Sequence, residues 1–340
     1  AFLAEILGTA DLVIAIGGDF PFANSYYAGH DFKYVQIDNS KLELGRHHVP
    51  DLAIWSDATS FVEKAIAASQ LVPESAFFKA AVADQKNWKA YLAQIKASQN
   101  ESLSPAQVYE QVNRIANQDS IFSIDVGDNI ISTFRYLNLA PTNRWLISAL
   151  FATMGSGVPG AIAAKLDEPN KQVFNIAGDG ALSMVMQDLV TMVKYHLPII
   201  NIVTQNGDLS FIEGEQEDLP MDIFGLDLQR QDFSMIAKGM GIDALKVKNY
   251  SELPSAFDTA LKATQAGKPF LLDIEINDHR ALPVEDLMVK VTDGKLEEKV
   301  NPRYLQQEGK TYSLAELFNK FDGENLKPLT DYFAEYDVKL

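Results

Sequence analysis

The sequence predicts an α/β fold built on parallel sheets, and two observations support this class. Short apolar runs alternate along the chain with segments of helical periodicity, as where Ile199–Thr204 follows a helical stretch. Strands separated by helices are typical of parallel sheets, because a parallel connection needs a long crossover. Several runs also end in glycine and acidic residues, as at Gly178-Asp179-Gly180, which is typical of the ligand-binding edge of such sheets.

Composition excludes several classes of function. The 340 residues suggest about two domains, and the absence of cysteine excludes disulfides, thiolate metal sites and a cysteine nucleophile. A net charge of −17 argues against binding to nucleic acid or to anionic membranes. No apolar run approaches the roughly 20 residues of a membrane span, and we expect a cytoplasmic protein. Because Ala1 enters a helical pattern without an initiator methionine, we expect a processed chain or a fragment.

The first block, residues 1–70, reads as part of a parallel α/β domain. The expected elements are a helix at Phe2–Thr9, a buried strand at Leu12–Ile16, further strands at Lys33–Ile37 and Leu52–Trp55, and a helix from Ala58 to Ala68. Residues 71–99 are polar and compatible with a helix, which favours an interdomain connection with helical content.

The second block, residues 100–276, repeats the pattern of strands and helices. Ser104, followed by Pro105 and then by Gln107 three positions after the serine, predicts the start of a helix. The expected strands are Ile121–Ile124, Trp145–Ser148, Gln172–Ala177, Ile199–Thr204, Leu245–Val247 and Phe270–Ile276, with helices at Gly155–Leu166, Ala181–His196 and Ser251–Thr264. The tail, residues 277–340, reads as mostly helical and polar.

Asp179 and Asn206 are the strongest candidates for a functional site. Each stands at the end of an expected strand, and one crossover helix separates the two strands. Such a unit opens a crevice at its carboxyl edge. Carboxylate and amide oxygens suit Mg²⁺, and a helix that starts beside them favours an anion. Gly-Asp-Gly alone is also common in ordinary turns, so the signal depends on its combination with Asn206.

This arrangement resembles the metal–diphosphate motif of thiamine-diphosphate enzymes. From about Ala10 onward the chain is similar to the flavin-containing pyruvate oxidases of lactic acid bacteria, over roughly the second half of a full-length enzyme. The stretches that carry the resemblance are Ser123–Asp128, Leu150–Gly155, Gly178–Asp188 and Tyr195–Glu215. It implies a parallel-sheet thiamine-diphosphate-binding domain, preceded by part of a Rossmann-like FAD-binding domain.

The resemblance also implies a role for individual residues. The side chains of Asp179 and Asn206 and the backbone carbonyl of Asp208 would bind Mg²⁺. The residues expected around the diphosphate are Val126, Gly127, Asp128, Gly178, Gly180 and Ala181. Met154 would bend the cofactor, and the carbonyl of Ala152 would accept a hydrogen bond from its aminopyrimidine.

Phe211 and Glu215 lie one helical turn apart, and the resemblance places both near the substrate. Three alternatives stay open: Met154 as a plain core methionine, Phe211 as a core aromatic, and Glu215 on a solvated helix face. Acetolactate synthases tend to have tryptophan at the position of Phe211, so phenylalanine favours the oxidase.

The first block carries the residues expected to bind FAD, which are Gly17, Gly18, Asp38 and Asp57. Glycine at a strand end with an acid one strand later suits a dinucleotide. Residues 1–70 contain no G-x-G-x-x-G stretch, so ordinary turn glycines are the alternative in this block. The paired His47-His48 lacks a third ligand nearby in sequence, and we interpret these histidines as structural.

The implied activity is that of a pyruvate oxidase, which converts pyruvate, phosphate and O₂ into acetyl phosphate, CO₂ and H₂O₂. The implied assembly is a homotetramer when the enzyme is full length. The pyrimidine-binding domain of such enzymes would precede this chain, so we expect the chain alone to be inactive or nearly so. Alternatives are an acetolactate synthase-like carboligase and a non-catalytic cofactor-binding module. The acidic balance of residues 318–340 disfavours a membrane-associated, quinone-linked relative.

Overall fold

The protein is described here by a computed structural model. The residues whose structure is described are 6–7, 9–18, 32–70, 73–97, 103–218, 222–276, 287–292, 295–299 and 310–312. The chain divides into two compact units, Ala1–Tyr91 with Pro283–Leu340 and Leu92–Leu282. Helix α4 (Ala76–Ala97) supplies the helical content expected of the connection. The helix expected at Phe2–Thr9 lies mostly outside the described residues.

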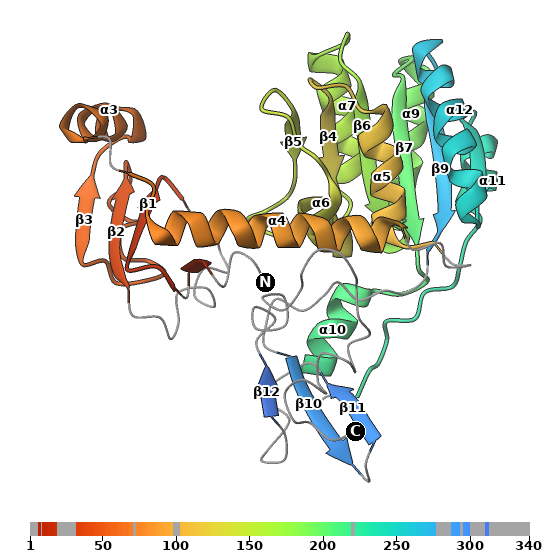
Figure 1. The fold of residues 1–340 in the computed structure, drawn as a ribbon. Helices are drawn as coiled ribbons and strands as arrows, with labels where there is room; N and C mark the ends of the chain where they lie inside the picture. Colours follow the sequence, from red (N-terminus) through yellow and green to blue (C-terminus); the bar gives the residue numbers. More distant parts are fainter. Residues whose placement is uncertain are drawn as a thin grey trace. The chain divides into compact units, whose positions relative to one another are not determined.

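The first unit contains a small parallel sheet in the order β1-β2-β3 (Figure 1). Its strands are β1 (Leu12–Ile16), β2 (Lys33–Asp38) and β3 (Leu52–Trp55), and helix α3 (Ala58–Ala68) follows them. The three strands and the helix confirm the sequence-based prediction. The expectation that β1 is buried was wrong: Leu12, Ile14 and Ile16 are 47%, 49% and 41% exposed, because these alternate residues point to one face of the sheet and that face is open at β1.

The second unit is built on a six-stranded, wholly parallel sheet, which confirms the predicted fold class. Its strands are β4 (Ile121–Ile124), β5 (Arg144–Leu146), β6 (Val173–Gly178), β7 (Ile199–Gln205), β8 (Asp243–Val247) and β9 (Phe270–Glu275). They lie in the order β5-β4-β6-β7-β9-β8. The chain therefore moves outward from β4 to β5 and then returns to the other side of β4 to form β6. Such a reversal opens a crevice at the carboxyl ends of the strands, where α/β sheets bind ligands.

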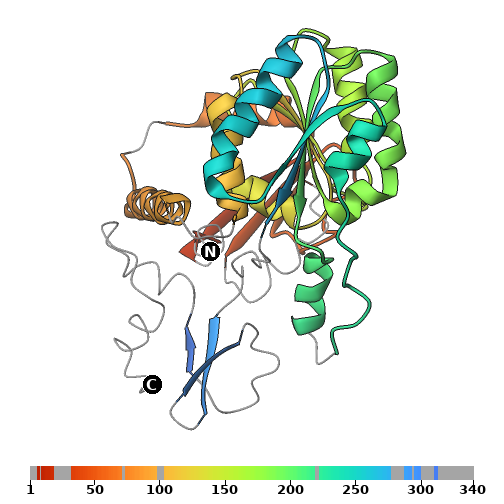
Figure 2. The same cartoon turned by 90° about the vertical axis from the view of Figure 1, so that its right-hand side faces the viewer.

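Helices cover both faces of this sheet (Figure 2). One face packs on α5 (Pro105–Ile115), α6 (Asp128–Tyr136) and α12 (Leu253–Gln265), and the other on α7 (Gly157–Asp167), α8 (Asp179–Val185), α9 (Leu189–Lys194) and α11 (Phe233–Gly239). Because helices cover both faces, every residue of β7 is buried, and its side chains do not alternate between buried and exposed. No described helix is both long enough and apolar enough to cross a membrane.

Two helix boundaries illustrate what local sequence could predict. The backbone N–H of Ser104 donates to Oε1 of Gln107 (2.9 Å), as expected for the start of α5. The single helix expected at Ala181–His196 is instead α8, a 3₁₀ turn η1 (Met186–Asp188) and α9. The break occurs at Val185, whose backbone is not helical (φ −139°, ψ 12°). Its side chain packs closely on Gly155, since a Cβ atom added to that glycine would lie 3.0 Å from Cγ1 of Val185.

The tail was expected to be mostly helical, and for its described residues this prediction was wrong. They form three antiparallel strands, β10 (Leu287–Thr292), β11 (Lys295–Lys299) and β12 (Lys310–Tyr312), in the order β11-β10-β12. The sequence itself contains the signals for strands rather than helices. Apolar residues alternate at Leu287, Val289 and Val291, and Asp293-Gly294 between the first two strands is a strong hairpin signal.

The substitution Phe257→Ala tests the core between α12 and the sheet. Phe257 is fully buried, so we expect its truncation to lower the free energy of unfolding of the second unit by about 3–5 kcal/mol. Urea unfolding followed by circular dichroism measures the change. The matched control is Phe224→Ala, because Phe224 is 84% exposed and should cost less than about 0.5 kcal/mol. Equal losses in the two variants would contradict this account of the core.

Candidate functional site

The carboxylate of Asp179 joins the ends of two neighbouring strands. Asp179 follows β6, begins α8 and is only 6% exposed. Its Oδ2 accepts a hydrogen bond from the backbone N–H of Gly207 in the loop after β7 (2.8 Å), and its Oδ1 accepts one from the N–H of Gly180 (2.9 Å). The ends of β6 and β7 therefore lie side by side, as the spacing of Asp179 and Asn206 predicts.

The surroundings of Asp179 favour a cation beside it. Burial raises the pKa of its carboxyl group, while the N–H groups of Gly207 and Gly180 and the charge of Arg230 act in the opposite direction. The net upward shift means that the ionised form is poorly solvated. A metal ion next to the carboxylate would offset this cost.

Asn206 and Asp208 bring further oxygen atoms to the same loop. Nδ2 of Asn206 donates to Oγ of Ser210 (2.8 Å), and Oδ1 of Asn206 accepts from the N–H of Asp208 (3.1 Å). Carboxylate, amide and carbonyl oxygens are the hard donors that Mg²⁺ prefers, so the predicted ligands fit this ion. Within the described ranges, no group of three or more His, Cys, Asp or Glu residues could hold a metal, so amide and carbonyl oxygens would have to complete the shell.

Asp125 is a structural residue of the site that the sequence analysis did not single out. It follows β4 and is fully buried, and its carboxylate accepts hydrogen bonds from the N–H groups of Val126 (2.8 Å), Gly155 (2.9 Å) and Gly157 (2.8 Å). It thereby ties the loop that contains Val126, Gly127 and Asp128 to the turn before α7. The available signal was an acidic residue directly after an apolar strand.

Two helices begin at the strand ends that flank the reversal of strand order. Helix α6 starts at Asp128 after β4, and α8 starts at Asp179 after β6. Gly127 precedes α6 with φ 131°, a conformation that favours glycine. The first N–H groups of a helix lack intrahelical acceptors and favour an anion, which fits the predicted diphosphate site.

Met154 lies against the end of β6. A Cβ atom on Gly180 would stand 3.4 Å from Cε of Met154 and 2.8 Å from Cδ2 of Leu209, so a larger residue at this position would require the Leu209 side chain to move. Ala152, two residues before Met154, has φ 48°, which is costly for a residue with a Cβ atom. Strain of this kind concentrates at ligand sites. The structure thus brings Met154 to the predicted diphosphate loop, while its role as a wedge stays a prediction.

Phe211 and Glu215 lie on α10 (Ser210–Asp218), which extends beyond the carboxyl ends of the strands (Figure 1). Phe211 is 40% exposed, which disfavours the alternative of a core aromatic. Glu215 is also exposed, so the alternative of a solvated helix face stays open. Contact of either residue with a substrate remains a prediction.

Arg230 is a second residue that the sequence analysis missed. Its Nη2 donates to the backbone oxygen of Asn206 (2.9 Å), and its Nη1 lies 3.9 Å from Oε2 of Glu275. Glu275 is paired in turn with Lys246 (2.9 Å) and Lys248 (3.1 Å). This network fixes the loop after β7 from the side of β8 and β9. No local pattern predicts it, because Arg230 follows Asn206 by a helix and a long loop.

In the first unit, Gly17 and Asp38 stand at the ends of adjacent parallel strands. The N–H of Gly17 (φ 62°) donates to the oxygen of Ile37 (2.8 Å), and Asp38 accepts from the N–H of Ser40 (2.7 Å). Asp57 caps α3 by accepting from the N–H of Ser60, which lowers the pKa of its carboxyl group. Binding of FAD by these residues and by Gly18 stays a prediction.

The histidine pair of the first unit shows an aromatic environment. The ring of His48 lies 5.2 Å from that of Tyr34 and 5.8 Å from that of Phe32, centroid to centroid. This packing agrees with a structural role for His48.

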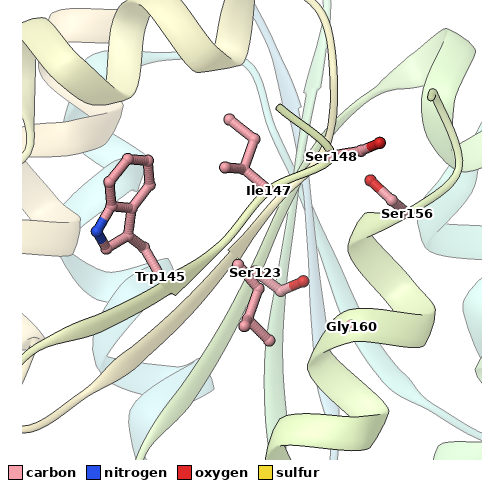
Figure 3. Close-up of a pocket in the computed structure, with 7 residues that line it drawn as sticks. Ser123, Trp145, Ile147, Ser148, Ser156 and Gly160 are labelled. Atoms are coloured by element: carbon pink, nitrogen blue, oxygen red, sulfur yellow. The ribbon is translucent and has the colours of Figure 1, made fainter. Parts of the chain in front are cut away.

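In the second unit, a cavity of about 470 Å³ lies between β5 and α7 (Figure 3). Its lining residues are Ser123, Trp145, Leu146, Ile147, Ser148, Ser156 and Gly160. Ser148 and Ser156 lie near each other on one side, and the ring of Trp145 lies across the strand (Figure 3). None of the predicted site residues lines it.

Comparison with known proteins agrees with this geometry. Residues 125–274 match the family described as thiamine pyrophosphate enzyme, C-terminal TPP binding domain, and residues 1–65 match the central domain of the same enzymes. The chain thus contains the C-terminal TPP-binding domain and the central domain of thiamine pyrophosphate enzymes. Within this class it is similar to a pyruvate oxidase of Lactiplantibacillus plantarum, with 39% identity over 98% of the chain and 53% of the relative.

Two further relatives show the breadth of the class. A putative thiamine pyrophosphate-containing protein, YdaP of Bacillus subtilis, is 30% identical over 82% of the chain and 48% of its own length. The acetolactate synthase large subunit of Porphyra purpurea is 25% identical over the same shares. The chain thus spans about half the length of these curated relatives.

The substitution Asp125→Ala tests the buried carboxylate that ties the β4 loop to the turn before α7. It leaves the N–H groups of Gly155 and Gly157 without their acceptor, at about 1–3 kcal/mol for each group. We therefore expect urea unfolding to show a loss of at least about 2 kcal/mol. Asp125→Asn keeps one acceptor oxygen and should lose less, and a loss below about 1 kcal/mol in Asp125→Ala would contradict the assignment.

Asp273 on β9 makes stability depend on pH. Burial raises the pKa of its carboxyl group from 3.8 to about 6, opposed by the N–H of Ser234 and by Lys246, while Asp232 and Glu275 add to the rise. Since the folded pKa is the higher one, this carboxyl group stabilises the fold below pH 3.8, and that contribution is lost as the pH rises through 6.

The variant Asp273→Asn stays neutral at every pH. We expect its free energy of unfolding, relative to the wild type, to increase between about pH 4 and 6 and then to level off, by up to about 3 kcal/mol. Urea unfolding at a series of pH values measures this difference. A difference that does not change with pH would contradict the shifted pKa.

Proposed function

We propose that the chain is the cofactor-binding half of a pyruvate oxidase. The reaction would convert pyruvate, phosphate and O₂ into acetyl phosphate, CO₂ and H₂O₂, in a cytoplasmic enzyme that is a homotetramer when full length. The observation that carries the proposal is the junction of the β6 and β7 ends through Asp179 and Gly207, beside Asn206. Similarity to a pyruvate oxidase over 98% of the chain supports the reaction.

The residues of the junction suit Mg²⁺ and a diphosphate. Asp179, Asn206 and the carbonyl of Asp208 would hold the ion, and the N–H groups at the starts of α6 and α8 would face the diphosphate. When bound, thiamine diphosphate supplies the group that would accept the electron pair left behind when CO₂ departs, and FAD supplies the oxidant. The chain itself binds and orients them: Asp125 and Arg230 fix the loops, and Met154 occupies the space beside Gly180.

An acetolactate synthase-like carboligase is the second candidate, because relatives with that name match 82% of the chain. Phe211, where such synthases tend to have tryptophan, favours the oxidase. An assay of acetyl phosphate against acetolactate separates the two. A non-catalytic cofactor-binding module would bind the cofactor without turnover, even when the other half of the enzyme is supplied.

The chain spans about half the length of its relatives, and the domains matched in it are the central and C-terminal ones. We expect the purified 340-residue chain to produce little or no peroxide from pyruvate and phosphate. A coupled peroxidase assay measures this. Robust turnover would show that the chain carries its own complete catalytic machinery.

The variants Asp179→Ala and Asn206→Ala test the cofactor site itself. Each removes an oxygen ligand, so we expect calorimetric titration with Mg²⁺ and thiamine diphosphate to show at least about 100-fold weaker binding than in the wild type. Asp243→Ala is the matched control, because Asp243 is exposed at the opposite, amino end of β8. If Asp179→Ala bound as tightly as this control, the proposed function would be wrong.

A further inference from the structure

The hydroxyl of Ser210 lies between two residues from different strand ends. Ser210 begins α10 and is only 9% exposed. Its Oγ donates a short hydrogen bond to Oδ2 of Asp128, after β4, and accepts one from Nδ2 of Asn206, after β7 (2.8 Å). The three side chains thus form a line that connects the β4 and β7 ends, on either side of the β6 end that bears Asp179.

The direction of these hydrogen bonds follows from elementary chemistry. An ionised carboxylate can only accept, so the single hydrogen of the Ser210 hydroxyl points to Asp128. The oxygen of Ser210 can then only accept from Asn206, which requires the NH₂ side of the amide to face Ser210. The amide oxygen is left on the other side, where it accepts from the N–H of Asp208 (3.1 Å).

An asparagine binds a cation only through its amide oxygen, and the two ends of the amide have almost the same shape. We propose that Asp128 and Ser210 are positioning residues that orient the amide of Asn206 so that its oxygen, and not its NH₂ group, faces the cation. This inference rests on the proposed metal–diphosphate site. The backbone N–H groups at the start of α6 would attract a diphosphate, whereas the carboxylate of Asp128 would repel it. The proposal therefore gives this carboxylate a different role, which is to hold Ser210.

The other hydrogen bonds of Asn206 agree with this assignment. Arg230 holds the backbone oxygen of Asn206 (2.9 Å) and thereby anchors the main chain of the loop. That contact leaves the side-chain torsions of Asn206 undetermined, and the orientation of the amide is set instead by two contacts of the side chain, the N–H of Asp208 on Oδ1 (3.1 Å) and Oγ of Ser210 on Nδ2 (2.8 Å). Of these two contacts, the one with Ser210 comes from a side chain that Asp128 in turn holds in place.

The test is calorimetric titration of the full chain with Mg²⁺ in the presence of thiamine diphosphate. We expect Ser210→Ala to weaken Mg²⁺ binding about 10–100-fold, as is typical when a partner of a metal ligand is removed. Ser210→Thr keeps the hydroxyl and should restore most of the affinity. Ser255→Ala, at the start of α12, is the matched control and should bind like the wild type.

A second background separates orientation from general damage. In Asn206→Asp both ends of the side chain are oxygen, so no orientation has to be chosen. We expect Ser210→Ala to cost less than about threefold in this background, whereas damage to the fold would cost as much as before. Likewise Asp128→Asn and Ser210→Ala should not add when combined, because they interrupt the same line.

Two outcomes would overturn the proposal, and they differ from failure of the proposed function. Unchanged Mg²⁺ affinity in Ser210→Ala, or an equal loss in the Asn206→Asp background, would exclude an orienting role. If the wild type itself does not bind, the proposed function fails, and the side-chain amide signals of Asn206 in a ¹⁵N nuclear magnetic resonance spectrum still test the line. These signals should move in Ser210→Ala, and unchanged signals would contradict the hydrogen bond.

Discussion

The hydrogen bond from the backbone N–H of Gly207 to the carboxylate of Asp179 is the contact on which the candidate site depends. It joins the ends of two neighbouring parallel strands, so a residue of one loop is held in place by a residue of the other. Asp179 is almost fully buried, and its raised pKa shows that this position is costly for an isolated charge. A buried carboxylate with oxygen donors beside it and helix starts around it is suited to a cation and an anion together.

Supporting contacts around this junction come from distant parts of the second unit. Asp125 fixes the loop after β4 to the turn before α7, and Arg230 fixes the loop after β7. Ser210 connects the β4 and β7 ends through Asp128 and Asn206. Each of these groups forms a hydrogen bond with a backbone or side-chain polar atom of another loop or turn. A rigid site results, because each loop is held by at least one charged or polar side chain from another element.

Local patterns predicted most elements of the second unit. Ser104, Pro105 and Gln107 predicted the start of α5, and apolar runs predicted the strands to within two or three residues. Predictions failed where tertiary packing overrides propensity. The helix expected at Ala181–His196 breaks at Val185, where the side chain packs on Gly155. For the described residues of the tail the alternation of Leu287, Val289 and Val291 was overlooked, so strands were expected to be helices.

By itself, the sequence determined the fold class, the strand ends that carry Asp179 and Asn206, and the family resemblance, because periodicity and motif spacing are local properties of the chain. Only the tertiary structure decided which side chains hold those strand ends. Asp125, Ser210 and Arg230 act on residues that are between 4 and 82 positions away in sequence, through loops whose course no periodicity predicts. Hydrogen bonds between loops depend on how strands are ordered in the sheet, and that order is a property of the packed molecule.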